Sequence, residues 1–242
     1  MNDLNPILYT IRPGDTLYNL AVRFGTTVEE IMNTNMALDP YNLRVGQQIY
    51  IYPYNDDFPN DYWFSINQVN LIKLMNLVWE QHIMWTRMLL ISIAEDLKDL
   101  DATQTRLLQN PKDIANVFRK YYGNNVANTI EKLLTEHLVI GKDLIVALKN
   151  NNQQLAKELN DKWYKNADAM AEAFSSINPF YPKEQVRQML YEHLKLTTEE
   201  VSARLRKDYT ANIKAYDMVQ REILSMSQFF VDGIVKQFPN LF

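Results

Sequence analysis

Three histidines, His82, His137 and His193, are the residues of this 242-residue sequence whose type and spacing could build a metal site. Imidazole nitrogens suit zinc and other first-row transition metals, and helical bundles often hold such ions in their cores. The sequence has no cysteine, so thiolate ligands, disulfide bonds and a cysteine nucleophile are excluded. Glu136 is adjacent to His137 and therefore points to a different helix face. The three histidines are thus the candidate ligands for zinc or another transition metal.

A second interpretation, which we favour on the sequence alone, gives the histidines a structural role. A buried imidazole needs hydrogen-bond partners, because an unpaired polar group costs free energy inside a protein. Asn110, Asn166 and Glu222 occupy matching places in later helical segments and are the expected partners. The three pairs would then form a polar layer that fixes the register of the helices.

The elements that carry the histidines are predicted to be helices. Glycine is scarce after residue 52, where it occurs only at positions 123, 141 and 233. Apolar residues recur in the same region at three- and four-residue spacing. Breaks that contain glycine, asparagine or proline separate the helical stretches. The expected helices cover residues 66–99, 102–121, 125–149, 153–176, 183–207 and 210–237.

An internal repeat of about 56 residues runs through this helical region. Residues 110–138 align with residues 166–194 without a gap and share seven identities, including the EHL triplets that contain His137 and His193. A fainter third copy places Glu222 one unit after Asn166. The pattern predicts a compact six-helix bundle, all-α in class, in which residues 66–242 form three repeated hairpins.

Residues 7–52 have a different pattern, which is typical of a small α+β unit. Alternating side chains at 9–11 predict a strand, and apolar residues at helical spacing follow it. Gly25 is placed to end a first helix, and a capping box that starts at Thr27 predicts a second. Residues 48–52 return the chain to an extended form. The expected order is therefore βααβ.

This stretch, with Asn35 and a later L-x-x-G-Q pattern at residues 43–47, resembles a LysM domain. The resemblance implies the βααβ fold and binding of glycans that contain N-acetylglucosamine, such as peptidoglycan or a chitin-type oligosaccharide. In that family the sugar lies in a shallow groove between two loops. The residues that the resemblance places in the groove are Gly14, Asp15, Thr16, Leu17, Met36, Ala37, Leu38 and Asp39.

The chemistry of such a groove is plausible for this sequence. Exposed backbone amides and carbonyls can pair with acetamido and hydroxyl groups, while Leu17 and Leu38 would cover the methyl group. Asp15 or Thr16 can also cap the first helix. Met36 and Ala37 stand where proline and glycine are commonest in the family, which adds bulk at the groove.

The helical region resembles an uncharacterised family of Firmicutes proteins, through the stretch WEQHIMWTRMLLISIAEDLKD and the repeated EHL triplet. That resemblance implies no particular activity. Between the two regions, residues 53–65 contain two prolines and are predicted to be a linker. The linker is rich in aromatic residues, which we expect to dock on one or both domains.

Composition excludes several classes of function. A net charge of −4 and an isoelectric point near 5.5 give no reason to expect nucleic acid binding. No window reaches the length of apolar sequence that a membrane span needs, and the N-terminal residues lack the pattern of a signal peptide. We therefore expect synthesis in the cytoplasm, with a location at cell wall peptidoglycan or at the spore, in association with the mother cell.

The sequence predicts a non-catalytic protein. Wall hydrolases use a cysteine, a zinc site on strands and loops, or a glutamate beside a loop-rich cleft, and none of these patterns occurs in the helical region. We expect a peptidoglycan-binding domain that anchors a helical bundle to cell wall or spore cortex. The alternatives are a ferritin-like metal-binding bundle with a LysM address, or a scaffold that binds a protein partner or forms a homodimer.

Overall fold

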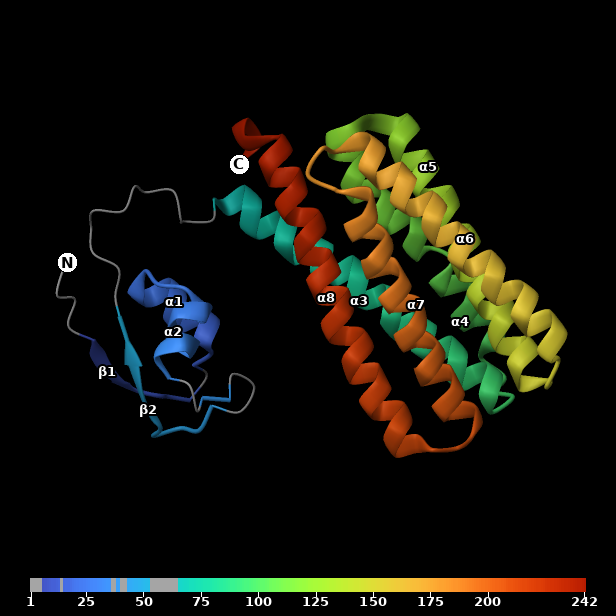
Figure 1. Cartoon of the computed structure of the whole chain (residues 1–242), viewed down its shortest axis with the longest axis horizontal. Helices are drawn as coiled ribbons and strands as arrows, with labels where there is room; N and C mark the ends of the chain where they lie inside the picture. The colour runs from blue at the N-terminus through green and yellow to red at the C-terminus, as the bar shows by residue number, and fades with distance from the viewer. Residues whose placement is uncertain (1–5, 14, 36–37, 40–42, 53–64) are drawn as a thin grey trace. The chain divides into compact units, whose positions relative to one another are not determined.

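The computed structural model describes residues 6–13, 15–35, 38–39, 43–52 and 65–242. The chain divides into two compact units, residues 1–63 and 64–242, each with its own hydrophobic core (Figure 1). Most of the predicted linker, residues 53–64, lies outside the described residues, and so does the expected docking of its aromatic side chains. We describe each unit separately.

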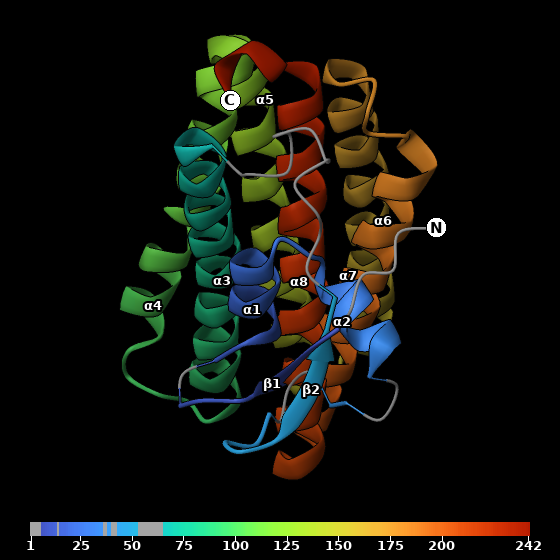
Figure 2. The same ribbon diagram turned by 90° about the vertical axis from the view of Figure 1, so that its left-hand side faces the viewer.

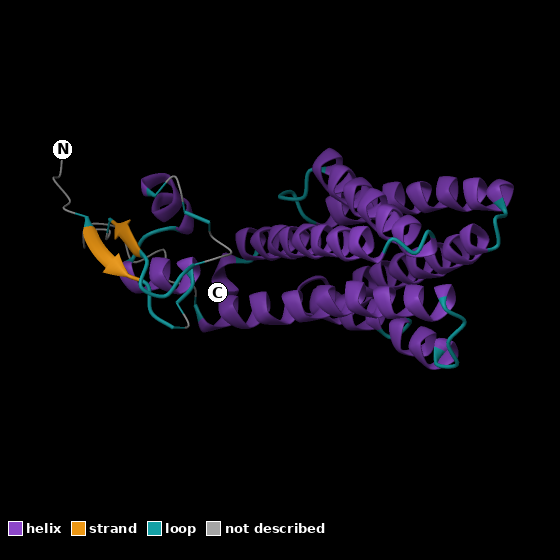
Figure 3. Cartoon of the chain, turned by 90° about the horizontal axis from the view of Figure 1, so that it is seen from below, coloured by secondary structure: helices purple, strands orange, loops and turns teal. Residues whose placement is uncertain are grey.

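The first unit is a two-stranded sheet with two short helices inserted between its strands. Strands β1 (Ile7–Thr10) and β2 (Gln48–Ile51) pair antiparallel, with Tyr9 opposite Ile49. Helices α1 (Leu17–Phe24) and α2 (Val28–Thr34) follow β1 in the chain. The order is the βααβ arrangement that the sequence predicts, and Figure 3 shows its strands as the orange arrows.

Local sequence signals determine where these helices begin and end. The Thr16 hydroxyl accepts a hydrogen bond from the Asn19 backbone N–H at 3.1 Å and so caps α1. Gly25 has a φ of 61°, which an L residue adopts only at a cost, and it ends that helix. Thr27 and Glu30 form the predicted capping box of α2.

One face of the two helices is buried against the sheet. The core of the unit contains apolar residues from both helices and both strands. Its members are Tyr9, Ile11, Leu17, Leu20, Ala21, Ile31, Leu38, Ile49 and Ile51. At roughly 1.5–3 kcal/mol for each fully buried large apolar side chain, this burial is the main contribution to the stability of so small a unit.

The second unit is helical in its described residues, and helices make up 78% of the chain overall (Figure 3). A 3₁₀ turn, η2, follows the last helix at Pro239–Leu241. The helices are α3 (Ile66–Ala94), α4 (Leu100–Leu107), α5 (Asn110–Lys149), α6 (Gln153–Ile177), α7 (Lys183–Leu205) and α8 (Tyr209–Gln237). Helix α8 lies between α3 and α7, as Figure 2 shows.

Two of the predicted helix boundaries are wrong. Helix α3 ends at Ala94 rather than near residue 99, because the next turns contain Asp96 in the left-handed conformation, with a φ of 54°. The helix expected at 102–121 is divided, since α4 ends at Leu107 and α5 begins at Asn110. Pro111 lies in the first turn of α5, where its missing N–H costs no helical hydrogen bond.

The predicted break near Gly123 is a kink inside α5. Gly123 has a φ of 78° and a ψ of −178°, while helical structure continues on both sides. Before the kink, the Phe118 ring packs against Phe174 of α6. After the kink, Lys149 donates a hydrogen bond to the Ile93 carbonyl of α3. Both parts of α5 thus contribute to the packing of the bundle.

Phenylalanines spaced by 56 residues meet in the core of the bundle. The ring of Phe174 lies 5.3 Å from that of Phe118 and 4.5 Å from that of Phe230, measured between centroids. Phe118 and Phe230 are 5.7 Å apart in an edge-to-face arrangement, and Trp79 stacks on Phe230. Positions related by the sequence offset therefore share one aromatic layer.

Among the described residues, no helix combines the length and the apolar character that crossing a membrane would require.

Candidate functional site

The strand-to-helix turn of the first unit is held by the Asp15 carboxylate. Its Oδ2 accepts hydrogen bonds from the Tyr9 hydroxyl at 2.8 Å and from the Arg12 backbone N–H at 2.7 Å. Arg23 donates to the same hydroxyl at 2.9 Å. The Arg12 N–H, with help from Tyr9, lowers the pKa of Asp15 below its usual value. Asp15 therefore orders the turn. The sequence analysis missed its partner Tyr9 and the Arg23 side chain that donates to the Tyr9 hydroxyl.

The other described groove candidates divide into exposed and buried side chains. Thr16 and Asp39 are exposed, whereas Leu17 and Leu38 lie in the core of the unit at 3% and 8% exposure. The backbone, rather than the side chain, is what Leu17 and Leu38 can offer a ligand. Gly14, Met36 and Ala37 lie outside the described residues.

Asn35 joins the second helix to the sheet. Its side-chain amide donates to the carbonyls of Ile31 and Tyr50, both at 2.7 Å, and its Oδ1 accepts from the Tyr50 N–H at 2.9 Å. The Asn35 carboxamide thus pairs with the N–H and the carbonyl of Tyr50 as a neighbouring strand would. Asn35 therefore fixes the C-terminal end of α2 against β2.

Tyr18 is an exposed aromatic residue beside the turn that the sequence analysis did not select. Its side chain is 53% exposed, and it follows Leu17 in the first turn of α1. A signal was present, because Tyr18 is out of phase with the apolar face formed by Leu17, Leu20 and Ala21. An exposed ring at this place can contact the apolar face of a sugar.

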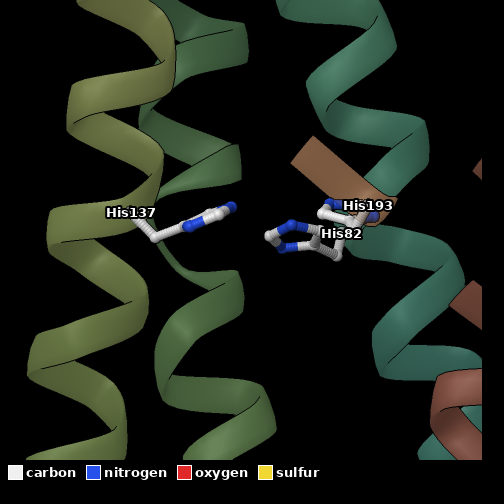
Figure 4. A group of neighbouring side chains, drawn as sticks. All are labelled: His82, His137 and His193. Atoms are coloured by element: carbon white, nitrogen blue, oxygen red, sulfur yellow. The ribbon is translucent and has the colours of Figure 1, made fainter. Parts of the chain in front are cut away.

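The second candidate site is a cluster of the three histidines in the bundle core. His82 comes from α3, His137 from α5 and His193 from α7, and all three are buried. One ring nitrogen of each lies within 4.8 Å of the others. The ring centroids are 5.8–6.1 Å apart, and Figure 4 shows the rings meeting from different helices.

Each histidine is hydrogen-bonded through Nδ1 to the partner that the sequence predicts. The distances are 3.0 Å from His82 to Asn110 Oδ1, 3.2 Å from His137 to Asn166 Oδ1, and 2.9 Å from His193 to Glu222 Oε2. The prediction of these three pairs is confirmed. In each case the partner lies on a neighbouring helix, α5, α6 or α8.

The asparagine partners also determine which imidazole nitrogen carries the proton. Asn110 Nδ2 donates to the Val78 carbonyl at 2.8 Å, and Asn166 Nδ2 donates to the Leu133 carbonyl at 3.1 Å. Their Oδ1 atoms are then left facing the histidines, and an oxygen can only accept. The Nδ1 atoms must therefore be the protonated donors, and Nε2 keeps a lone pair. A carboxylate at Glu222 imposes the same tautomer on His193.

Burial favours the neutral form of the His82 and His137 imidazoles. Loss of hydration, together with the nearby His193 and against the opposing hydrogen bond to Asn110, lowers the pKa of His82 to about 3. Burial, together with the neighbouring His82 and His193, places the pKa of His137 well below its usual value. Neutral imidazole is the form that binds a metal ion.

A cavity of about 30 Å³ adjoins the cluster. Its wall includes all three histidines, the Trp163 ring and Thr197. Thr197 lies one helical turn after His193 and is 5% exposed, yet its hydroxyl oxygen has no hydrogen-bond partner among the described residues. The sequence analysis noted Thr197 only as a neighbour of His193 on the same helical face.

A buried ion pair lies next to this layer. Arg87 on α3 contacts the Glu200 carboxylate on α7 and donates to Asn212 Oδ1 at 2.9 Å. Burial raises the pKa of Glu200, while Arg87 opposes that shift. Arg87 also stacks over the Tyr216 ring at 4.6 Å. These contacts connect α3, α7 and α8, and the sequence analysis did not foresee them.

The described residues of the first unit thus form a small βααβ module with an ordered turn beside exposed Thr16. Residues 9–51 match the family model of the LysM domain. The chain therefore carries a LysM domain, a module that generally binds peptidoglycan or chitin and points to an association with the cell wall.

No curated protein matches the chain, and no solved structure does. The resemblance of the helical region to a Firmicutes family stays a prediction.

Proposed function

We propose that this protein binds glycans containing N-acetylglucosamine through its LysM domain and thereby attaches its helical bundle to cell wall peptidoglycan. The observation that carries the proposal is the family match over residues 9–51, in a unit with a closed core. In this proposal the bundle is a non-catalytic domain that the LysM domain holds at the wall. We also propose spore cortex as a wall layer to which the protein binds, after its deposition from the mother cell.

A preordered turn supports binding by this domain. Asp15 is held by Tyr9 and Arg12, and Thr16 is held as the cap of α1. A groove edge that is ordered before binding loses less conformational entropy when a ligand arrives. Thr16 and Tyr18 follow this turn directly in the sequence, and both are exposed. We expect the sugar to bind beside them.

Sedimentation with purified peptidoglycan tests this assignment. The full chain should sediment with the polymer, whereas a chain of residues 65–242 should stay in solution. That shorter chain keeps Ser65, whose hydroxyl caps α3, and it keeps the bundle core intact. Equal sedimentation of both chains would contradict the assignment to the LysM domain. Immunolocalisation would test the wall or spore location separately.

A scaffold role for the bundle is the second candidate, because one face of α3 exposes apolar side chains. Leu74, Leu77, Met84 and Met88 are 39–52% exposed. They are separated by three, seven and four residues, which places them on one face of the helix. A second copy of this chain is the partner we propose for that face. Leu77→Lys should then lower the sedimentation coefficient at high concentration, while Leu155→Lys on α6, where Leu155 is 40% exposed, should not.

A further inference from the structure

We propose that His82, His137 and His193 bind one zinc ion at the centre of the helical bundle. The three side chains come from α3, α5 and α7, and one ring nitrogen of each lies within 4.8 Å of the other two (Figure 4). These are the only histidines of the protein, so all of its imidazole ligands are in one place.

The hydrogen bonds around the cluster leave one nitrogen of each histidine without a donor or a cation to bind. Nδ1 of each ring is the donor to Asn110, Asn166 or Glu222, so each remaining nitrogen is an acceptor. Three acceptor nitrogens are therefore gathered in one buried cluster, and no hydrogen bond from the described residues to them is found. A polar layer that served only to fix helix register would pair its donors with acceptors. A bound cation resolves the mismatch.

The spacing suits a small transition-metal ion. Zinc binds imidazole nitrogen at about 2.0–2.1 Å, so tetrahedral ligands lie about 3.4 Å apart. The three nitrogens lie within 4.8 Å of one another, so modest side-chain movement closes the site. Calcium and magnesium prefer oxygen ligands, and no carboxylate competes with the imidazoles in the set of three.

The surrounding groups resemble those that support metal-bound histidines. A ligating histidine usually donates its other N–H to a carboxylate or carbonyl oxygen, which orients the ring. Here Glu222 also contributes negative charge, and its second oxygen, Oε1, is buried without a partner among the described residues. The nearby cations are already paired, since Lys142 contacts Asp143 at 3.4 Å and Arg87 contacts Glu200.

The fourth position of the ion faces the cavity. Thr197 lines that cavity, and its Oγ1 is buried without a partner among the described residues, so this hydroxyl is the candidate to hydrogen-bond a water molecule on the metal. The cavity wall also includes half-buried Thr86, Lys142 and Thr198, which gives solvent an approach. Three protein ligands with an open fourth place is the arrangement of zinc sites that exchange a ligand.

Metal retention by the untagged full chain tests the proposal. After equilibration with zinc and gel filtration, elemental analysis should find one zinc ion per chain, and zinc should raise the melting temperature. Magnesium at the same concentration should do neither. In the imidazole ¹⁵N spectrum, all three histidines should begin as the Nδ1–H form, and all three Nε2 signals should shift on adding zinc.

Two variants separate ligand loss from a general change in the core. His137→Gln should lose zinc retention and the rise in melting temperature, whereas Thr197→Val leaves all three nitrogens in place and should keep one zinc ion. Wild-type protein without stoichiometric zinc, or His137→Gln that retains as much zinc as wild type, would overturn the proposal. If His137→Gln fails to fold, the wild-type ¹⁵N spectrum still tests the proposal. Nε2 signals that stay unchanged on adding zinc would overturn it.

Discussion

The carboxamide of Asn110 connects His82 to the preceding turn of its own helix. Its Oδ1 lies 3.0 Å from His82 Nδ1, while its Nδ2 donates to the Val78 carbonyl at 2.8 Å. Val78 is one turn before His82 on α3, so the asparagine spans a full turn of that helix. Asn166 makes the same two contacts with His137 and Leu133. The imidazole orientation is thus built into the packing between helices.

Asn110→Leu removes both bonds at a site that is fully buried. The free energy of unfolding should fall by about 2–3 kcal/mol in urea denaturation of the metal-free protein, because His82 loses its partner in the core. Zinc affinity should fall by roughly 10–100-fold, because the ring is no longer oriented.

Asn212→Leu is the matched control for that variant. Asn212 is 1% exposed and also makes two side-chain bonds, to Arg87 and to the Glu200 carbonyl, but none to a histidine. It should lose similar stability and keep its zinc affinity. If both variants lost zinc affinity equally, Asn110 would have no specific role in positioning His82.

Gly233→Ala should be among the most destabilising small substitutions. A methyl group there would lie 2.0 Å from Cε1 of Tyr181, a ring that is 1% exposed and whose hydroxyl donates to the Phe230 carbonyl at 2.5 Å. We expect a loss of about 3 kcal/mol or more by denaturation. Gly123→Ala meets no atom within 4 Å, but Gly123 has a φ of 78° and a ψ of −178°, which side chains rarely adopt, so the change should cost about 1–3 kcal/mol. The reverse ranking would contradict this account.

Tyr122 gives the bundle a specific sensitivity to alkaline pH. Burial raises the pKa of Tyr122 from 10.0 to about 12. Between these values the unfolded chain loses the proton that the folded protein keeps, so stability present below pH 10 is lost as the pH rises towards 12. Tyr122→Phe should weaken that loss in denaturation curves measured at successive pH values.

The same variant has a cost at neutral pH. Asn178 Nδ2 donates to the Tyr122 hydroxyl at 2.9 Å, and that hydroxyl donates to Gln237 at 2.8 Å. Tyr122→Phe should therefore lower stability by about 1 kcal/mol at pH 7. An alkaline profile identical in slope to that of wild type would show that Tyr122 is not responsible.

Thr16 and Thr27 offer a matched pair for locating the glycan groove. Both are exposed and both cap a short helix, through Asn19 and Glu30 respectively. Changing either to leucine should cost about 1 kcal/mol through loss of the cap. Only Thr16→Leu adds bulk at the proposed groove, so only it should weaken sedimentation with peptidoglycan. Equal weakening by Thr27→Leu would indicate a general loss of folding.

The features that could be predicted from the sequence depend on short-range rules. Residue spacing predicted the capping box at Thr27, and the 56-residue offset predicted that His82 and His137 pair with Asn110 and Asn166. Capping and helix periodicity act over a few residues, and a repeat transfers one interface to the next.

The features that escaped prediction depend on tertiary packing. Leu17 and Leu38 have the right type for covering a ligand methyl group, yet the small unit needs both in its core. The unpaired hydroxyl of Thr197 and the Arg87–Glu200 contact arise where separate helices meet. Local spacing contains no information on which of several apolar or polar faces another helix will cover.

The central claim, that the LysM domain binds N-acetylglucosamine glycans, is tested most directly by titrating the full chain with a soluble β-1,4-linked N-acetylglucosamine oligomer. A glucose oligomer of equal length and linkage is the control, since it lacks only the acetamido groups. The account predicts saturable heat release with the first oligomer and none with the second, and no response from residues 65–242. Absence of binding to the N-acetylglucosamine oligomer, or equal binding to both sugars, would contradict it.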